Sequence, residues 1–256
     1  MVMCMQEWYC NDLYCRRYGH SGRNILLVNG AMADCSFYDD LASYLSDTYT
    51  VYTYDHPGYG RSDEEGKSLV EQAEDIQHLI HAIGSCSVVG HSCGAIPVLQ
   101  YLMQDGSGMD HVLLYEPFLC DLSDDIRIER LKKDMPVLLK EERYEDAGMA
   151  LLDVLSAEPD ARAFGEAQRE YFTKNSHAFY AHECMSMLEY GMDYGKLDGR
   201  KIFVGIGDCS AGMPCEEMAE RFREAADCAM VWFKGAHDAP YEQYQAFGKA
   251  MKELSL

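Results

Sequence analysis

Val88 to Gly94 reads V-V-G-H-S-C-G, and this stretch decides the fold of the chain. Two apolar residues lead into the G-x-S-x-G pattern, and a helical pattern follows at once from Ala95 to Met103. A G-x-S-x-G at a strand-to-helix junction is typical of a nucleophile elbow, a turn so tight that residues flanking the serine have almost no room for side chains. The stretch therefore predicts that Ser92 stands at the top of a sheet with its hydroxyl exposed.

Runs with strand character alternate with helical patterns along the chain, which predicts an α/β fold with a mostly parallel sheet and right-handed crossovers. Two further runs at the N-terminus predict strands at a sheet edge. The predicted strands are Met5 to Cys10, Leu13 to Tyr18, Ile25 to Val28, Tyr49 to Tyr54, Cys86 to Val89, Val112 to Tyr115, Lys201 to Ile206 and Ala229 to Phe233.

The middle of the chain has a different character, because Cys120 to Lys196 shows helical patterns and no strand pattern. We therefore expect a helical insertion of about half a domain. Its predicted helices are Ile126 to Leu131, Val137 to Leu155, Ala161 to Phe172 and Ala178 to Tyr190.

Length and charge narrow the class of protein. With 256 residues the chain can bury a large core, and one domain carrying an insertion fits this length. The 22 basic and 43 acidic residues give a formal charge of −21, which disfavours nucleic acid and anionic membranes as partners. No apolar run approaches the ~18 residues of a membrane span.

Cysteine usage and the N-terminus predict a cytoplasmic protein with reduced thiols. The eleven cysteines are odd in number, and none form a C-x-x-C pair or a cluster with zinc spacing, so no metal is expected. The first residues lack a basic region followed by an apolar core, so no signal peptide is expected.

Polar residues follow several predicted strands, and parallel strands gather such residues at one edge of the sheet. A serine hydroxyl needs an imidazole to accept its proton, and that imidazole needs a carboxylate to hold its tautomer. Ser92, Asp208 and His237 provide these groups in chain order, and Glu116, which follows the preceding strand, is the alternative acid. We expect the N–H of Cys93 and that of Ala31, in the loop 29–31, to form the oxyanion hole.

The chain resembles the α/β-hydrolase superfamily in four motifs: the elbow, the loop Asp55 to Ser62, the acid turn Gly205 to Asp208 and the histidine loop Gly235 to His237. The resemblance implies a mostly parallel eight-stranded sheet flanked by helices. It also implies a core of residues 1–119 and 197–256 with a helical cap at 120–196. The family usually has His-Gly where this chain has Asn29-Gly30.

The resulting hypothesis is a serine hydrolase that cleaves an ester, thioester or related acyl bond of a small, largely uncharged substrate. Met32, His56 and Tyr180 are candidate substrate contacts. No organic cofactor is implied, and the protein is expected to be a monomer or a homodimer. A C–C bond hydrolase, an acyltransferase and a small-molecule receptor that retains the fold are the alternatives, because fold and triad alone do not decide function.

Overall fold

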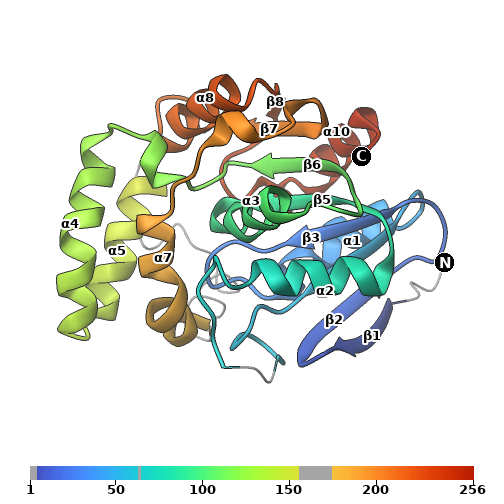
Figure 1. Cartoon of the computed structure of the whole chain (residues 1–256), viewed down its shortest axis with the longest axis horizontal. Coiled ribbons are helices and arrows are strands. Elements are labelled where there is room, and N and C mark those ends of the chain that lie inside the picture. The colour runs from blue at the N-terminus through green and yellow to red at the C-terminus, as the bar shows by residue number, and fades with distance from the viewer. Residues whose placement is uncertain (1–4, 63–64, 156–174) are drawn as a thin grey trace.

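The computed structural model describes residues 5–62, 65–155 and 175–256. Within these ranges one sheet has eight strands in the order β1-β2-β4-β3-β5-β6-β7-β8 (Figure 1). β2 pairs antiparallel with β1 and β4, and the other neighbours pair parallel, which confirms the predicted mostly parallel sheet. The strands are β1 Met5–Cys10, β2 Leu13–Tyr18, β3 Asn24–Val28, β4 Thr50–Tyr54, β5 Cys86–His91, β6 Met109–Tyr115, β7 Ile202–Gly207 and β8 Ala229–Phe233.

Helices cover both faces of the sheet, and the apolar strands supply both cores. In β3, Leu26 and Val28 pack in the core that contains α2, α3 and α8, whereas Ile25 and Leu27 pack with α1 and α10. Successive strand residues point to opposite faces, so an unbroken apolar run is what a doubly covered strand requires. These helices are α1 Asp39–Leu45, α2 Ala73–Ile83, α3 Ala95–Gln104, α8 Pro214–Ala226, the short α9 Ala239–Glu242 and α10 Tyr244–Leu254.

The segment 120–196, called the cap segment below, follows β6 and precedes β7. Where the structure describes it, this segment contains helices and no strand. Its longer helices gather beside the end toward which β6 points, at the left of Figure 1. They are α4 Ile126–Lys140, α5 Tyr144–Leu155 and α7 Cys184–Glu189, with a π-helix at Phe179–Glu183.

The helices of the cap segment differ from their sequence patterns in three places. α4 continues through residues 132–136, where the sequence pattern had separated two helices. The single helix predicted from Val137 to Leu155 is divided between α4 and α5, because Glu142 has a φ of 56° and a left-handed residue does not continue a right-handed helix. The helix predicted from Ala178 to Tyr190 contains the wider π-turn before α7. The predicted helix Ala161 to Phe172 lies outside the described residues.

Small elements complete the chain: single 3₁₀ turns precede α1, form the elbow, open the cap segment and lead into β7. These turns are Cys35–Tyr38, Ser92–Gly94, Cys120–Leu122, Tyr194–Lys196 and Gly199–Lys201.

None of the helices that the structure describes is long and apolar enough to cross a lipid bilayer. The ten cysteines that it describes are free thiols, and of these only Cys209 is exposed.

Candidate active site

The turn between β5 and α3 has the geometry of a nucleophile elbow. Ser92 has a left-handed φ of 55°, a conformation that costs a non-glycine residue roughly 1–2 kcal/mol and persists only where the surroundings enforce it. A Cβ on Gly94 would lie 2.0 Å from the carbonyl oxygen of Asn29, and one on Gly90 would lie 3.0 Å from the Ala95 Cα. The close packing of strand, loop and helix therefore requires glycine at position 94 and leaves little room for a side chain at position 90.

His91 lies beside the elbow and positions the histidine loop. Its ring stacks on Phe37 with centroids 5.5 Å apart, and its Nε2 lies 2.9 Å from the carbonyl oxygen of His237. Burial and the neighbouring His237 lower the pKa of His91 to about 3, so its imidazole is neutral. A neutral ring carries one N–H, and the carbonyl fixes it on Nε2. His91 therefore donates to the backbone of His237 and holds that residue against the elbow.

Glu116 is the carboxylate that contacts His237. Its Oε2 lies 2.9 Å from His237 Nδ1, and its Oε1 accepts a hydrogen bond of 2.9 Å from the Gly207 N–H. Glu116 is fully buried and follows β6 with a left-handed φ of 42°. Both oxygens of the buried carboxylate are thus engaged, and one of them fixes the orientation of the imidazole.

The two groups stabilise each other's charged form. Burial by itself would raise the pKa of Glu116, but the hydrogen bond and charge of His237, together with donors from Ser210 and Gly207, hold this pKa below its usual value. Burial by itself would lower the pKa of His237, and the hydrogen bond and charge of Glu116 raise it above its usual value instead. An imidazolium that forms at His237 is therefore stabilised by the adjacent carboxylate.

The prediction that Asp208 is the acid partner of His237 is wrong in this structure. The Asp208 carboxylate lies 2.5 Å from Lys234 Nζ and accepts a 3.0 Å hydrogen bond from the Gly235 N–H. Its side chain is 36% exposed, and the hydrogen bond with Lys234 lowers its pKa. Asp208 stabilises the outside of the histidine loop, whereas Glu116 occupies the buried side.

The physical reason for this correction lies at the end of β7. A Cβ on Gly207 would lie 2.8 Å from the Tyr115 hydroxyl and 3.0 Å from Glu116 Oε1. The closest atom would be the Gly235 carbonyl oxygen, at 2.4 Å. The missing side chain thus makes room for the histidine loop and for groups from the end of β6. Tyr115 Oη also donates a hydrogen bond of 2.6 Å to the Ala236 carbonyl, so the end of β6 fixes the histidine loop as well as its acid.

The loop after β3 passes directly beside the nucleophile. A Cβ on Gly30 would lie 3.0 Å from the Cβ of Ser92, which is a tight contact, so glycine favours this approach. Asn29, which stands where the family usually has histidine, is buried and donates to the Tyr54 carbonyl at 3.0 Å. The loop is therefore stabilised from β4 and lies in reach of the elbow.

Cys93 of the elbow and Ala31 of the loop after β3 lie close to one another. Burial, together with the charges of Glu183 and Cys184, raises the pKa of the Cys93 thiol well above its usual value, although the backbone N–H groups of Cys93 and Ala31 oppose the shift. A thiol that stays protonated is a poor nucleophile. Cys93 thus provides a backbone N–H beside Ser92 and does not compete with it.

The three candidate substrate contacts differ in their surroundings. His56 is fully buried and stacks between Tyr54 and Tyr59, with ring centroids 5.2 and 5.4 Å away, which leaves neither face of its ring for a substrate. Tyr180 stacks on Tyr144 of α5 at 5.5 Å. Met32 is buried and has a left-handed φ of 60°. Substrate contact by Tyr180 and Met32 stays a prediction.

Sequence reasoning missed two buried polar residues of the cap segment that make hydrogen bonds near the loop after β3. Glu183 and Asn175 are both buried, and each makes a hydrogen bond to the core. The one available signal was Glu183 itself. It is the single carboxylate in the mostly apolar run from Phe179 to Leu188, whose further polar residues are His182 and Ser186. A buried charge in such a run needs partners, which the sequence alone does not identify.

One trio of residues among those described has atoms close enough to share a metal ion: Asp34, Cys35 and Asp55. The Asp55 carboxylate already accepts hydrogen bonds from the backbone N–H groups of Cys35 at 2.8 Å and Arg61 at 2.7 Å. Asp34 caps the turn that begins at Cys35. These contacts explain the trio as a brace between two loops.

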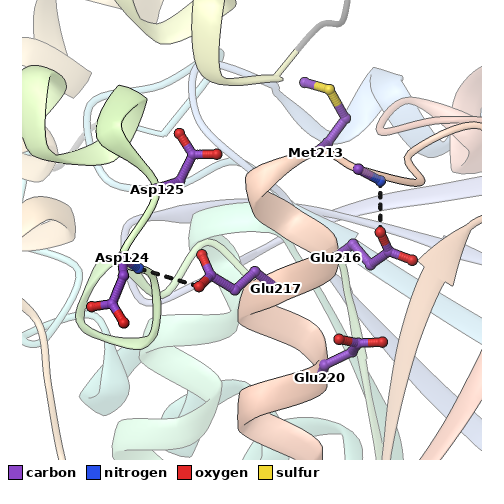
Figure 2. Close-up of a pocket in the computed structure, with 7 residues that line it drawn as sticks. Asp124, Asp125, Met213, Glu216, Glu217 and Glu220 are labelled. Carbon is purple, nitrogen blue, oxygen red and sulfur yellow. Dashed lines mark hydrogen bonds between the residues drawn. The ribbon is translucent and has the colours of Figure 1, made fainter.

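A hollow on the surface lies at α8 and the loop before α4, and Figure 2 shows its acidic lining. The Glu216 carboxylate accepts from the Gly212 N–H at 2.6 Å, and that of Glu217 accepts from the Asp124 N–H at 3.4 Å. The hollow contains none of the groups around Ser92. Its lining is Asp124, Asp125, Gly212, Met213, Glu216, Glu217 and Glu220.

Comparisons with known proteins agree with the fold. A model of the alpha/beta hydrolase family matches residues 25–250. The chain is similar to the uncharacterized hydrolase YraK of Bacillus subtilis (strain 168), with 25% identity over 246 residues, 91% of this chain and 89% of that protein. It is also similar to the structure of a hydrolase from Pseudomonas aeruginosa PA01, with a TM-score of 0.76, 15% identity and coverage of 100% and 99% of the two chains. A thermophilic esterase from Thermogutta terrifontis gives a TM-score of 0.74, 19% identity and coverage of 95% of this chain and 92% of its own.

Proposed function

Because the chain belongs to the α/β-hydrolase family and is a hydrolase of that fold, we propose that Ser92, His237 and Glu116 form its catalytic triad. The reaction is hydrolysis of an ester, thioester or related acyl bond in a small, largely uncharged substrate. The observation that carries the proposal is the 2.9 Å hydrogen bond that His237 Nδ1 donates to buried Glu116. With it goes the strained elbow conformation of Ser92, the residue after His91, whose ring centroid lies 4.7 Å from that of His237.

The proposed mechanism assigns one task to each group. His237 Nε2 accepts the proton of Ser92 as Oγ attacks the acyl carbon, and Glu116 stabilises the imidazolium that forms. The backbone N–H groups of Ala31 and Cys93 donate to the oxyanion of the tetrahedral intermediate. His237 then gives its proton to the leaving group, and water, activated by the same imidazole, hydrolyses the acyl-enzyme.

Covalent labelling and turnover together test the proposal. The wild-type protein should react with a fluorophosphonate probe and release many equivalents of p-nitrophenol from a short-chain p-nitrophenyl ester. Ser92→Ala should abolish both signals, and His237→Ala should nearly do so, because the hydroxyl then has no base. Labelling without turnover across a broad ester panel would favour a receptor, a C–C bond hydrolase or an acyltransferase. A folded wild-type protein that does not label would mean that no such triad is assembled.

A further inference from the structure

The backbone N–H and the backbone carbonyl of Met32 are both held by hydrogen bonds from outside the loop after β3. The Met32 N–H donates to the Tyr59 hydroxyl at 3.2 Å, and the Met32 carbonyl accepts from Asn175 Nδ2 at 2.8 Å. Met32 is the residue after Ala31 and has a left-handed φ of 60°. A methionine does not prefer this conformation, so external contacts have to maintain it.

The first contact continues into the cap segment through a buried carboxylate. The Tyr59 hydroxyl accepts from Met32 and donates to Glu183 Oε2 at 2.7 Å. Gln72 Nε2 donates to Glu183 Oε1 at 2.8 Å. Glu183 belongs to the π-helix Phe179–Glu183. A buried carboxylate keeps strong hydrogen-bond donors in place, so Glu183 fixes the direction of the Tyr59 hydroxyl.

The second contact joins two loops of the core. While its Nδ2 donates to Met32, Asn175 Oδ1 accepts from the Gly60 N–H at 3.1 Å. The Asn175 side chain is buried, so its amide has little freedom to turn away. The cap segment thus contacts the oxyanion loop directly through Asn175 and indirectly through Glu183 and Tyr59.

We propose that Glu183 and Asn175 of the cap segment, acting with Tyr59, are positioning residues that hold the Met32 peptide and thereby keep the Ala31 N–H in the oxyanion hole. The inference rests on the proposed function. The Met32 N–H is committed to Tyr59, which leaves the preceding N–H of Ala31 as the donor of this loop to the oxyanion. The cap segment therefore acts on the acyl-transfer step.

Two conservative variants and one matched control test this role. Tyr59→Phe removes only the hydroxyl, and Asn175→Asp keeps the acceptor for Gly60 while removing the donor to Met32. Ser186→Ala is the control, since Ser186 Oγ joins the cap segment to the core by accepting from the Leu69 N–H at 3.0 Å. Its other hydrogen bond, of 2.8 Å to the Glu183 carbonyl, leaves the Glu183 carboxylate and Met32 untouched. Each variant is assayed for kcat, KM and thermal unfolding on the ester that the wild type hydrolyses best.

The two variants should lower kcat by about tenfold or more with KM nearly unchanged, because the oxyanion hole acts in the transition state. Affinity for a trifluoromethyl ketone, whose adduct places an oxyanion in the hole, should fall by a similar factor. Ser186→Ala should keep wild-type values for both. A role in folding alone would instead lower the melting temperature and leave the kcat of the folded protein unchanged.

Folded Tyr59→Phe and Asn175→Asp proteins that match Ser186→Ala in kcat would overturn the proposal, as would a rise in KM with kcat unaffected. If Asn175→Asp does not fold, Tyr59→Phe decides, because its ring keeps the stack on His56. Failure of the proposed function has a different signature, since the wild type itself would then neither label with a fluorophosphonate nor turn over esters.

Discussion

At the residue scale, the carboxylates of Glu116 and Asp208 lie at the ends of neighbouring strands and have opposite surroundings. Glu116 is enclosed and bonded to His237, whereas Asp208 is exposed and paired with Lys234. Glu116→Gln should lower kcat by about 10⁴-fold, because the amide no longer stabilises the imidazolium or enforces the productive tautomer. Steady-state kinetics of the folded variant check this expectation.

Asp208→Asn is the matched control and should change kcat only slightly, because its amide oxygen can still accept from the Gly235 N–H. The pair of variants separates the two assignments without ambiguity. A large loss in Asp208→Asn together with an active Glu116→Gln would restore the acid that the sequence favoured.

The pH dependence of Ser92 reactivity reports on His237. The pKa of His237 is raised by Glu116, and only the neutral imidazole can accept the serine proton. The rate of fluorophosphonate labelling should therefore rise with pH and have its midpoint above the unperturbed value of ~6.5. Asp208→Asn should leave the midpoint in place. A wild-type midpoint at or below the unperturbed value would contradict the ion pair.

Ser92 and His237 could be predicted from the sequence because each lies in a recognisable local segment. Ser92 lies in the glycine-flanked elbow, and His237 lies in the loop after the last strand. The acid was not marked in this way. Glu116 and His237 are 121 positions apart and meet only because β6 and β8 both flank β7. The glycine that suggested an acid turn, Gly207, is required by the close approach of the Gly235 carbonyl, with Tyr115 and Glu116 also nearby. Strand order, which periodicity does not contain, decided the assignment.

At the scale of elements, α10 stabilises the strands that carry the acid and the histidine loop. Phe247 of α10 stacks on Phe233 with ring centroids 4.4 Å apart and meets Tyr115 edge-on at 4.8 Å. Phe247→Ala should cost roughly 3–5 kcal/mol of unfolding free energy, because it opens a cavity in a fully buried aromatic cluster. Equilibrium unfolding in urea measures this loss.

Lys249→Ala is the control on the same helix. Its side chain is 74% exposed, so the stability should change by no more than about 0.5 kcal/mol. A loss in Phe247→Ala as small as that in the control would show that α10 does not pack as the structure has it.

The elements themselves were predictable where burial is two-sided. β3 shows this most clearly, because Ile25 to Val28 is a continuous apolar run, and the helices on the sheet follow regular apolar spacing. Helix ends in the cap segment were not predictable from the sequence. No glycine or proline marks the left-handed Glu142 or the π-turn Phe179–Glu183. Tertiary packing determines where these helices break, so the periodicity of apolar residues in the sequence does not show the breaks.

At the scale of the whole molecule, the formal charge is −21, and the excess carboxylates repel one another, which opposes the compact state. The surface hollow of Figure 2 concentrates this repulsion, since five carboxylates line it. Arg221 pairs with Asp124 and Glu217, and Arg127 pairs with Asp125, which offsets the repulsion only in part. Adding NaCl from ~10 to ~150 mM shortens the screening length from about 30 to about 8 Å and should raise the melting temperature.

Neutralising one of these carboxylates separates the local repulsion from the general one. Glu220→Gln should raise the melting temperature at low salt, by the equivalent of about 0.2–1 kcal/mol, and by less at ~150 mM NaCl. Asp47→Asn is the control, because Asp47 pairs with Lys252 at 2.7 Å and its loss should not stabilise the protein. Differential scanning calorimetry at the two salt concentrations measures both variants. A melting temperature that falls as NaCl is added would show that paired charges outweigh repulsion across the molecule, and equal gains in the two variants would show that the hollow contributes nothing of its own.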